Sequence, residues 1–131
     1  MHFRTRPIAL VILSLCFLVK LHASVLTWDG KGRISMEIIE GRQKKVKVGF
    51  PFKNDSDHPV TITSVKTDCE CVTAAPAANT CPPGMKTMVI VTFDVAGLTG
   101  LQEKYVTVTT DEPNHPPTRL LLRVNIVKQA Q

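Results

Sequence analysis

Three cysteines in one short stretch are the part of the chain best suited to chemistry. Cys69 and Cys71 have a single residue between them, and Cys81 follows in a segment rich in alanine and proline. In an exported protein such thiols form disulfides, and three thiols leave one over. We expect Cys71 to bond Cys81, with Cys69 to Cys81 as the alternative. Either disulfide closes a loop of about ten residues and constrains the unfolded chain.

The same sulfur atoms allow two other interpretations. Two thiolates one residue apart, a third thiolate and a nearby thioether would suit a soft ion such as Cu(I). This copper site would consist of Cys69, Cys71, Cys81 and Met85. Thiol-redox chemistry is the related alternative, although the stretch lacks the Cys-x-x-Cys at a helix start that lowers a thiol pKa. A further possibility leaves all three thiols reduced, or pairs one with another chain. The disulfide interpretation requires no cofactor, and copper is the alternative.

A polar turn over residues 54–59 contains the residue types of a hydrolytic triad. Ser56, Asp57 and His58 are consecutive. A triad is assembled from separated segments, and neighbouring residues in one turn cannot easily point at one another. We expect no catalytic residues and predict that the protein is not an enzyme.

The N-terminus has the composition of a secretory signal peptide over residues 1–23. An apolar run from Ile8 to Val19 follows basic residues, and cleavage is expected after Ala23. The run is shorter than the roughly 20 apolar residues of a membrane span, so no stable membrane insertion of the mature chain is expected. The protein is predicted to be exported, to the periplasm or beyond. Residues 24–131, 131 − 23 = 108 in number, form a single domain.

The charge of the mature chain gives little reason to expect nucleic-acid binding. The formal charge is +5, and the leader contributes Arg4, Arg6 and Lys20 with no acid, which leaves 5 − 3 = +2. One basic cluster remains between residues 42 and 47, and we interpret it as a solvated strand face. That cluster consists of Arg42, Lys44, Lys45 and Lys47.

Alternation of apolar and polar residues predicts strands through most of the mature chain. About seven strands are expected, over residues 25–28, 34–38, 46–52, 60–71, 89–93, 104–110 and 120–127, with a bulge near Thr63 and Ser64. Pro51 lacks an amide donor, so its end of the strand is expected at a sheet edge or a bulge. The predicted core consists of Val46, Val48, Phe50, Phe52, Val60, Ile62, Val89, Val91, Phe93, Val106, Val108, Leu120, Leu122, Val124 and Ile126. This pattern predicts an all-β fold, an immunoglobulin-like antiparallel β-sandwich.

The number of strands decides which loops lie together. If residues 70–75 form a strand of their own, the turns with His58, Cys81 and His115 share one end of the sandwich. If they do not, His115 joins the cysteine loop and His58 lies at the opposite end. Loop histidines are usually solvated, so we assign neither of them to a site.

The order of motifs from Val48 to Val127 resembles the exported bacterial family of unknown function DUF1573. The resemblance rests on residues 52–57 (Phe-Lys-Asn-Asp-Ser-Asp), 59–62 (Pro-Val-Thr-Ile), 65–71 (Val-Lys-Thr-Asp-Cys-Glu-Cys), 83–84 (Pro-Gly), 91–94 (Val-Thr-Phe-Asp), 100–104 (Gly-Leu-Gln-Glu-Lys) and 108–111 (Val-Thr-Thr-Asp). It implies an immunoglobulin-like sandwich related to PapD-like and ASH-like domains, and it implies no activity. Two features depart from the family pattern: Glu70 replaces the glycine usual between the paired cysteines, and Cys81 is additional.

These observations favour a non-enzymatic protein-binding or scaffolding module. Its edge strands or loops would contact another exported or envelope protein. The alternative is a copper-binding or thiol-redox protein that acts through its three cysteines.

Overall fold

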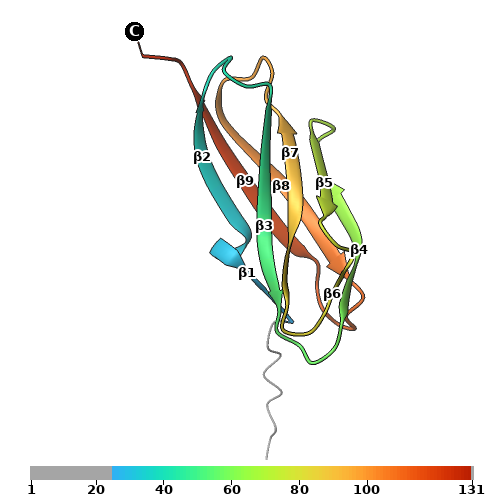
Figure 1. Ribbon diagram of the computed structural model, residues 1–131. Helices are drawn as coiled ribbons and strands as arrows, with labels where there is room; N and C mark the ends of the chain where they lie inside the picture. The colour runs from blue at the N-terminus through green and yellow to red at the C-terminus, as the bar shows by residue number, and fades with distance from the viewer. Residues whose placement is uncertain (1–24, 131) are drawn as a thin grey trace, which may run out of the picture.

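The computed structural model describes residues 25–130, and the predicted signal peptide lies outside them. Two sheets face each other as a sandwich (Figure 1). The elements are β1 (Leu26–Trp28), the 3-10 turn η1 (Asp29–Gly32), β2 (Arg33–Ile39), β3 (Lys45–Asn54), β4 (Val60–Thr67), β5 (Val72–Pro76), β6 (Thr80–Cys81), β7 (Lys86–Asp94), β8 (Gly100–Thr110) and β9 (Thr118–Val127). No helix among these residues is long and apolar enough to cross a membrane. The all-β sandwich predicted from the sequence is confirmed.

The strand order is β1-β3-β7-β5 in one sheet and β2-β9-β8-β4-β6 in the other. The pairs are antiparallel except β2 with β9, which run parallel. The chain passes from the first sheet to the second through η1, so β1 and β2 edge different sheets. Gly32 ends this crossing at a φ of +71°, and a Cβ there would lie 2.9 Å from Leu120 Cδ2. A side chain at position 32 would therefore strain the backbone and press into the core.

The core lies between the sheets and follows from the alternation in the sequence. All of the residues expected there are buried, apart from Val48, which is partly buried and packs against the others. Leu26, Val72, Cys81 and Val95 are buried with them and were not anticipated. The expected bulge in β4 is also present, because the register with β8 shifts between Ile62 and Ser64.

The structure has nine strands instead of about seven. The two additional strands are β5, with five residues, and β6, with two. They lie in the segment rich in alanine and proline, where side chains give little strand signal. Pairing with β7 and with the start of β4 makes these segments extended.

Candidate functional site

The disulfide joins Cys69 to Cys71, in the turn between β4 and β5, and Cys81 is the free cysteine within residues 25–130. The expected pairing of Cys71 with Cys81, and the alternative of Cys69 with Cys81, are therefore corrected. The reason lies in the length of β4. Cys81 pairs with Val60 at the first residue of this eight-residue strand, whereas the disulfide follows its last residue. At about 3.3 Å per residue the two ends are roughly 20 Å apart.

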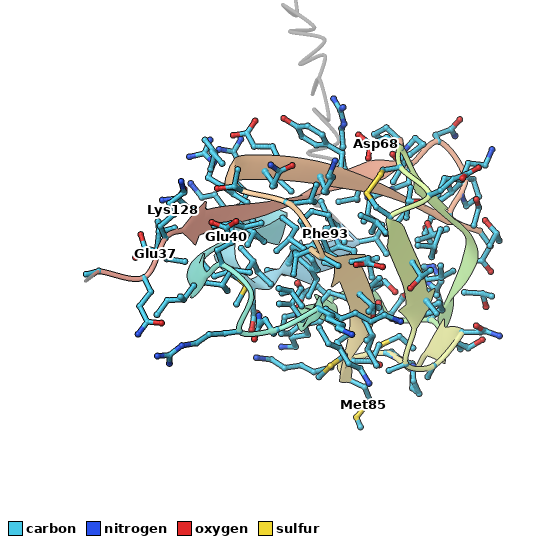
Figure 2. The ribbon with its side chains drawn as sticks, turned by 90° about the horizontal axis from the view of Figure 1, so that it is seen from above. Glu37, Glu40, Asp68, Met85, Phe93 and Lys128 are labelled. Atoms are coloured by element: carbon cyan, nitrogen blue, oxygen red, sulfur yellow. A yellow bond between two sulfur atoms is a disulfide. The ribbon has the colours of Figure 1, made fainter. Side chains whose placement is uncertain are left out.

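The same separation rules out the predicted copper site. Cys81 and Met85 lie at one end of β4, and the disulfide pair lies at the other, so the four sulfur atoms cannot bind one ion. Cys81 is buried, with its Sγ 3.3 Å from the carbonyl oxygen of Met85. Met85 itself is 56% exposed and extends away from the body of the domain (Figure 2). Within residues 25–130, no group of three or more His, Cys, Asp or Glu is placed to hold a metal ion.

The disulfide turn is partly exposed and is held by the backbone around it. The Cys69 carbonyl accepts a hydrogen bond from the Val72 amide at 3.1 Å, and the Cys71 carbonyl accepts one from the Asp94 amide at 2.8 Å. Thr67 Oγ1 donates to the carbonyls of Cys69 and Val72. These bonds fix where β5 begins, so the turn sets the position of β5 beside β4.

The Cys69–Cys71 pairing predicts the result of a peptide map. Alkylation of the protein unfolded in urea without reductant should label Cys81, which is buried in the folded domain. Proteolysis after Glu70 should leave the two halves of the turn joined until a reductant is added. The double substitution Cys69→Ser with Cys71→Ser should lower the free energy of unfolding by only about 1.5 kcal/mol, because a three-residue loop removes little entropy from the unfolded chain. Label on Cys69 or Cys71 instead would contradict the pairing.

At the other end of β4, a buried asparagine organises the loops. Asn54 is 0% exposed. Its Nδ2 donates to the carbonyls of His58 and Cys81, both at 2.9 Å, and its Oδ1 accepts from the backbone and hydroxyl of Ser56. From the sequence, Asn54 was only one of several turn formers, and nothing in its neighbourhood marked it as buried.

His58 connects this loop to the one between β8 and β9. Its Nδ1 lies 2.8 Å from Asp57 Oδ1, and its Nε2 contacts Glu112 Oε1. The His115 amide donates to the Glu112 carbonyl in the same loop. The turns with His58, Cys81 and His115 therefore share one end, the arrangement expected if residues 70–75 contribute a strand.

The His58 contacts predict a pH dependence. Hydrogen bonds to Asp57 and Glu112 raise the pKa of His58 above its ordinary value. The stabilisation from protonated His58 is then complete below about pH 6.5 and is lost as the pH rises through the higher folded pKa. Thermal unfolding of the wild type between pH 5 and 8 should show this loss, and Glu112→Gln should reduce it. Identical pH profiles for the two proteins would contradict the prediction.

One side of the sandwich leaves two strand edges open, and they face each other. β5 forms the edge of its sheet, and β6 covers β4 only at Val60 and Thr61, so β4 is uncovered from Thr63 to Thr67. No backbone hydrogen bond joins β4 directly to β5 within the described chain. Figure 1 shows β4 and β5 side by side at this edge of the molecule.

The register shows which backbone groups of β5 point outward. The Ala77 amide donates to the Met88 carbonyl, and the Asp94 amide donates to the Cys71 carbonyl. In an antiparallel pair such bonding recurs at every second residue, so Thr73 and Ala75 also face β7. Ala74 therefore presents both its N–H and its C=O to the open edge, and Pro76 presents a carbonyl alone.

Two hollows flank β5 and share the residues Ala74, Ala75 and Pro76. One, of about 180 Å³, lies toward β4 and is lined also by Ile62, Thr63, Ser64, Val65 and Asn79. The other, of about 270 Å³, lies on the outer face of the sheet and is lined also by Lys47, Thr73, Ile90 and Thr92. β5 thus has space on both sides and an unpaired edge. We take β5 and these hollows as the candidate binding site.

Comparison with solved structures gives the fold. A protein of unknown function from Porphyromonas gingivalis W83 is similar over 78% of this chain and 46% of its own, with a TM-score of 0.65 and 18% identity. The ASH/PapD-like domain 7 of human CEP192 is similar over 90% of this chain and 99% of its own, with a TM-score of 0.62 and 12% identity. The YadV chaperone is similar over 78% of this chain and 52% of its own, with a TM-score of 0.56 and 15% identity. The fold is therefore PapD-like and immunoglobulin-like.

This chain spans less than half the length of the Porphyromonas gingivalis protein. A search of curated proteins found no match. The sequence matches the family described as "Protein of unknown function (DUF1573)" over residues 26–126, which is most of the chain. The chain therefore belongs to the DUF1573 family.

Proposed function

We propose that the chain is an exported, non-enzymatic protein-binding module. It binds an extended segment of another exported or envelope protein along the open edge of β5. The observation that carries this proposal is the unpaired backbone of Ala74 between two hollows. An added strand would gain hydrogen bonds from the Ala74 N–H and C=O, and its alternate side chains would lie beside the hollows.

The length and composition of β5 favour pairing with one specific partner strand over pairing with any exposed strand. Open edges are a liability that proteins limit with short strands and proline. β5 has only five residues, and Pro76 removes one outward donor from its end. The edge left open is short, so affinity would depend on side chains that fit the hollows as well as on the backbone.

Site-specific photo-crosslinking in the exporting cell tests this proposal. A photoreactive residue in place of Thr63 or Thr73 should give discrete adducts with a partner, because both positions line the hollows. The same residue in place of Leu101, which is 56% exposed on the other sheet, is the control and should give none. Ala74→Pro removes the outward donor and should abolish the adducts. Equal adducts from all three positions, or none from the hollows, would refute the proposal.

A second candidate function is thiol–disulfide exchange at Cys69 and Cys71. The observation that favours it is the pairing of two partly exposed cysteines across a loop too short to contribute much stability. A dithiol partner would attack one sulfur as a thiolate, break the S–S bond and form a mixed disulfide. The second thiolate of the partner would then attack the mixed disulfide and form a disulfide within the partner. This step releases Cys69 and Cys71 as thiols, so two electrons and two protons have passed to this chain. Reversible reduction by a glutathione buffer, with the fold retained, is the expected result, and resistance to millimolar dithiothreitol would exclude this function.

A further inference from the structure

The outer face of the four-stranded sheet is rich in lysine around an apolar centre. Side chains of β3, β5 and β7 that point away from the core meet there in register. The polar members are Lys45, Lys47, Lys53, Lys86, Thr73, Thr92 and Asp94, and the small or apolar ones are Gly49, Pro51, Ala75, Met88 and Ile90. We call this surface the lysine face. It carries four lysines and a single acid.

Three of these lysines have no ionic partner. Lys53 lies 3.6 Å from Asp55, and no ion pair involves Lys45, Lys47 or Lys86 within the part of the chain that the structure describes. Lys86 lies opposite Lys53 in the register, so two like charges are adjacent at one end of the face. This arrangement is unfavourable for the isolated domain and becomes favourable when an anionic group is bound.

On the outer face of the second sheet, two of the cations have partners within the domain. Arg123 lies 2.6 Å from Glu103, and the guanidinium of Arg119 stacks over the Tyr105 ring at 3.8 Å. Arg33 and Lys66 on that face form no ion pair within the described residues, and of the two outer faces it is the lysine face that includes side chains of β5.

The centre of the lysine face is apolar and hollowed. Met88 lies across the position where Gly49 has no side chain, and Met88 is 39% exposed. Ile90 lines the 270 Å³ hollow together with Lys47 and residues of β5. An apolar side chain seated on Ile90 would therefore have a lysine ammonium on one side and the open strand edge on the other.

We infer that the partner segment is acidic, with carboxylates alternating with small apolar or β-branched residues, and that the lysine face selects it. This inference rests on the proposed function and specifies the chemistry of the partner. A strand paired with β5 would direct every second side chain toward the lysine face, because side chains of a strand alternate between the faces of a sheet. Carboxylates at those positions would be drawn toward Lys47 and Lys86, which have no internal partner.

Binding of short peptide probes tests this inference on the intact exported protein. The probes are labelled ten-residue peptides in which valine or threonine alternates with glutamate, glutamine or lysine. Fluorescence anisotropy should show the strongest binding for the glutamate probe and a loss of affinity with added salt. The double variant Lys47→Glu with Lys86→Glu should bind this probe about tenfold more weakly or worse.

A matched double variant controls for net charge. Arg33→Glu with Lys66→Glu makes the same charge change at exposed positions of the second sheet and should bind like the wild type. Equal affinity for the three probes, or no loss in the lysine-face variant, overturns the inference. Failure of all probes to bind also overturns it, as does binding to phosphatidylglycerol vesicles alone, which would assign the face to a membrane surface.

The variant Ala74→Pro separates this inference from the proposed function. Suppose that the glutamine and glutamate probes bind the wild type equally well and that Ala74→Pro abolishes the binding of both. Strand pairing then stands, and the acidic preference fails. If it leaves lysine-dependent binding of the glutamate probe unchanged, the acidic preference stands and strand pairing fails.

Discussion

Replacing Asn54 with leucine is expected to lower the free energy of unfolding by about 3 to 5 kcal/mol. The Asn54 side chain is fully buried and donates to two carbonyls, those of His58 and Cys81. Leucine has a similar size but removes the Asn54 donor to the Cys81 carbonyl and the acceptor of the Ser56 amide. The His58 carbonyl would keep only its hydrogen bond from the Ser56 hydroxyl. A buried polar group without a partner costs about 1 to 3 kcal/mol, so the losses accumulate.

Urea unfolding of the variants measures this effect. Asn125→Leu is the control, because the Asn125 side chain makes only one long hydrogen bond, at 3.4 Å to Glu37, at an exposed site. It should change stability by less than about 0.5 kcal/mol. If Asn54→Leu costs no more than the control, the assigned role of Asn54 in joining the loops is wrong.

Phe93→Ala is expected to cost about 3 to 5 kcal/mol. Phe93 is fully buried on β7 and lies at the centre of the domain (Figure 2). In the register Phe93 lies beside Val46 on β3 and Val72 on β5, so its ring covers the inner face of three neighbouring strands. A truncated side chain would leave a cavity that the two rigid sheets could fill only in part.

The Phe93 prediction also bears on the binding site. Val72 begins β5, so loss of the ring beneath it should loosen β5 more than β2, which lies at the far edge of the other sheet. Thermal unfolding gives the loss of stability, and hydrogen exchange of the two strands gives its location. Leu101→Ala, at a 56% exposed position, is the control. A loss for Phe93→Ala below about 1 kcal/mol would contradict the packing described here.

The sequence predicts the strands and their buried faces correctly wherever apolar and polar side chains alternate over several residues. In β3 and β9 every second residue is apolar, and burial of one face follows from that pattern alone. The end of β3 at Pro51 was expected at a sheet edge or a bulge, but residues 52–54 pair with β1. Pro51 itself has no neighbour on that side, because β1 ends at Trp28, opposite Phe52. A residue without a donor is tolerated there because no strand is present to accept from it.

The candidate site was harder to predict, because partner strands create it. β5 has alanine and proline where a strand usually has β-branched residues, and it is extended because β7 pairs with it. With residues 60–71 predicted as one strand, Cys69 and Cys71 lie at its end and Cys81 in the loop that follows, so a disulfide to Cys81 is the pairing that the sequence favours. Likewise, the spacing of Lys47 and Lys86 in sequence gives no sign that β3 and β7 place them on the same face.

Hydrogen exchange at the Ala74 amide tests the central claim most directly. In the free protein this amide should exchange about a hundredfold faster than those of Thr73 and Ala75, because only those two bond β7. In the isolated photo-crosslinked complex, Ala74 should become protected while Thr73 and Ala75 change little. Equal protection of the three amides in the free protein, or an unchanged Ala74 amide in the complex, would contradict binding by strand addition to β5.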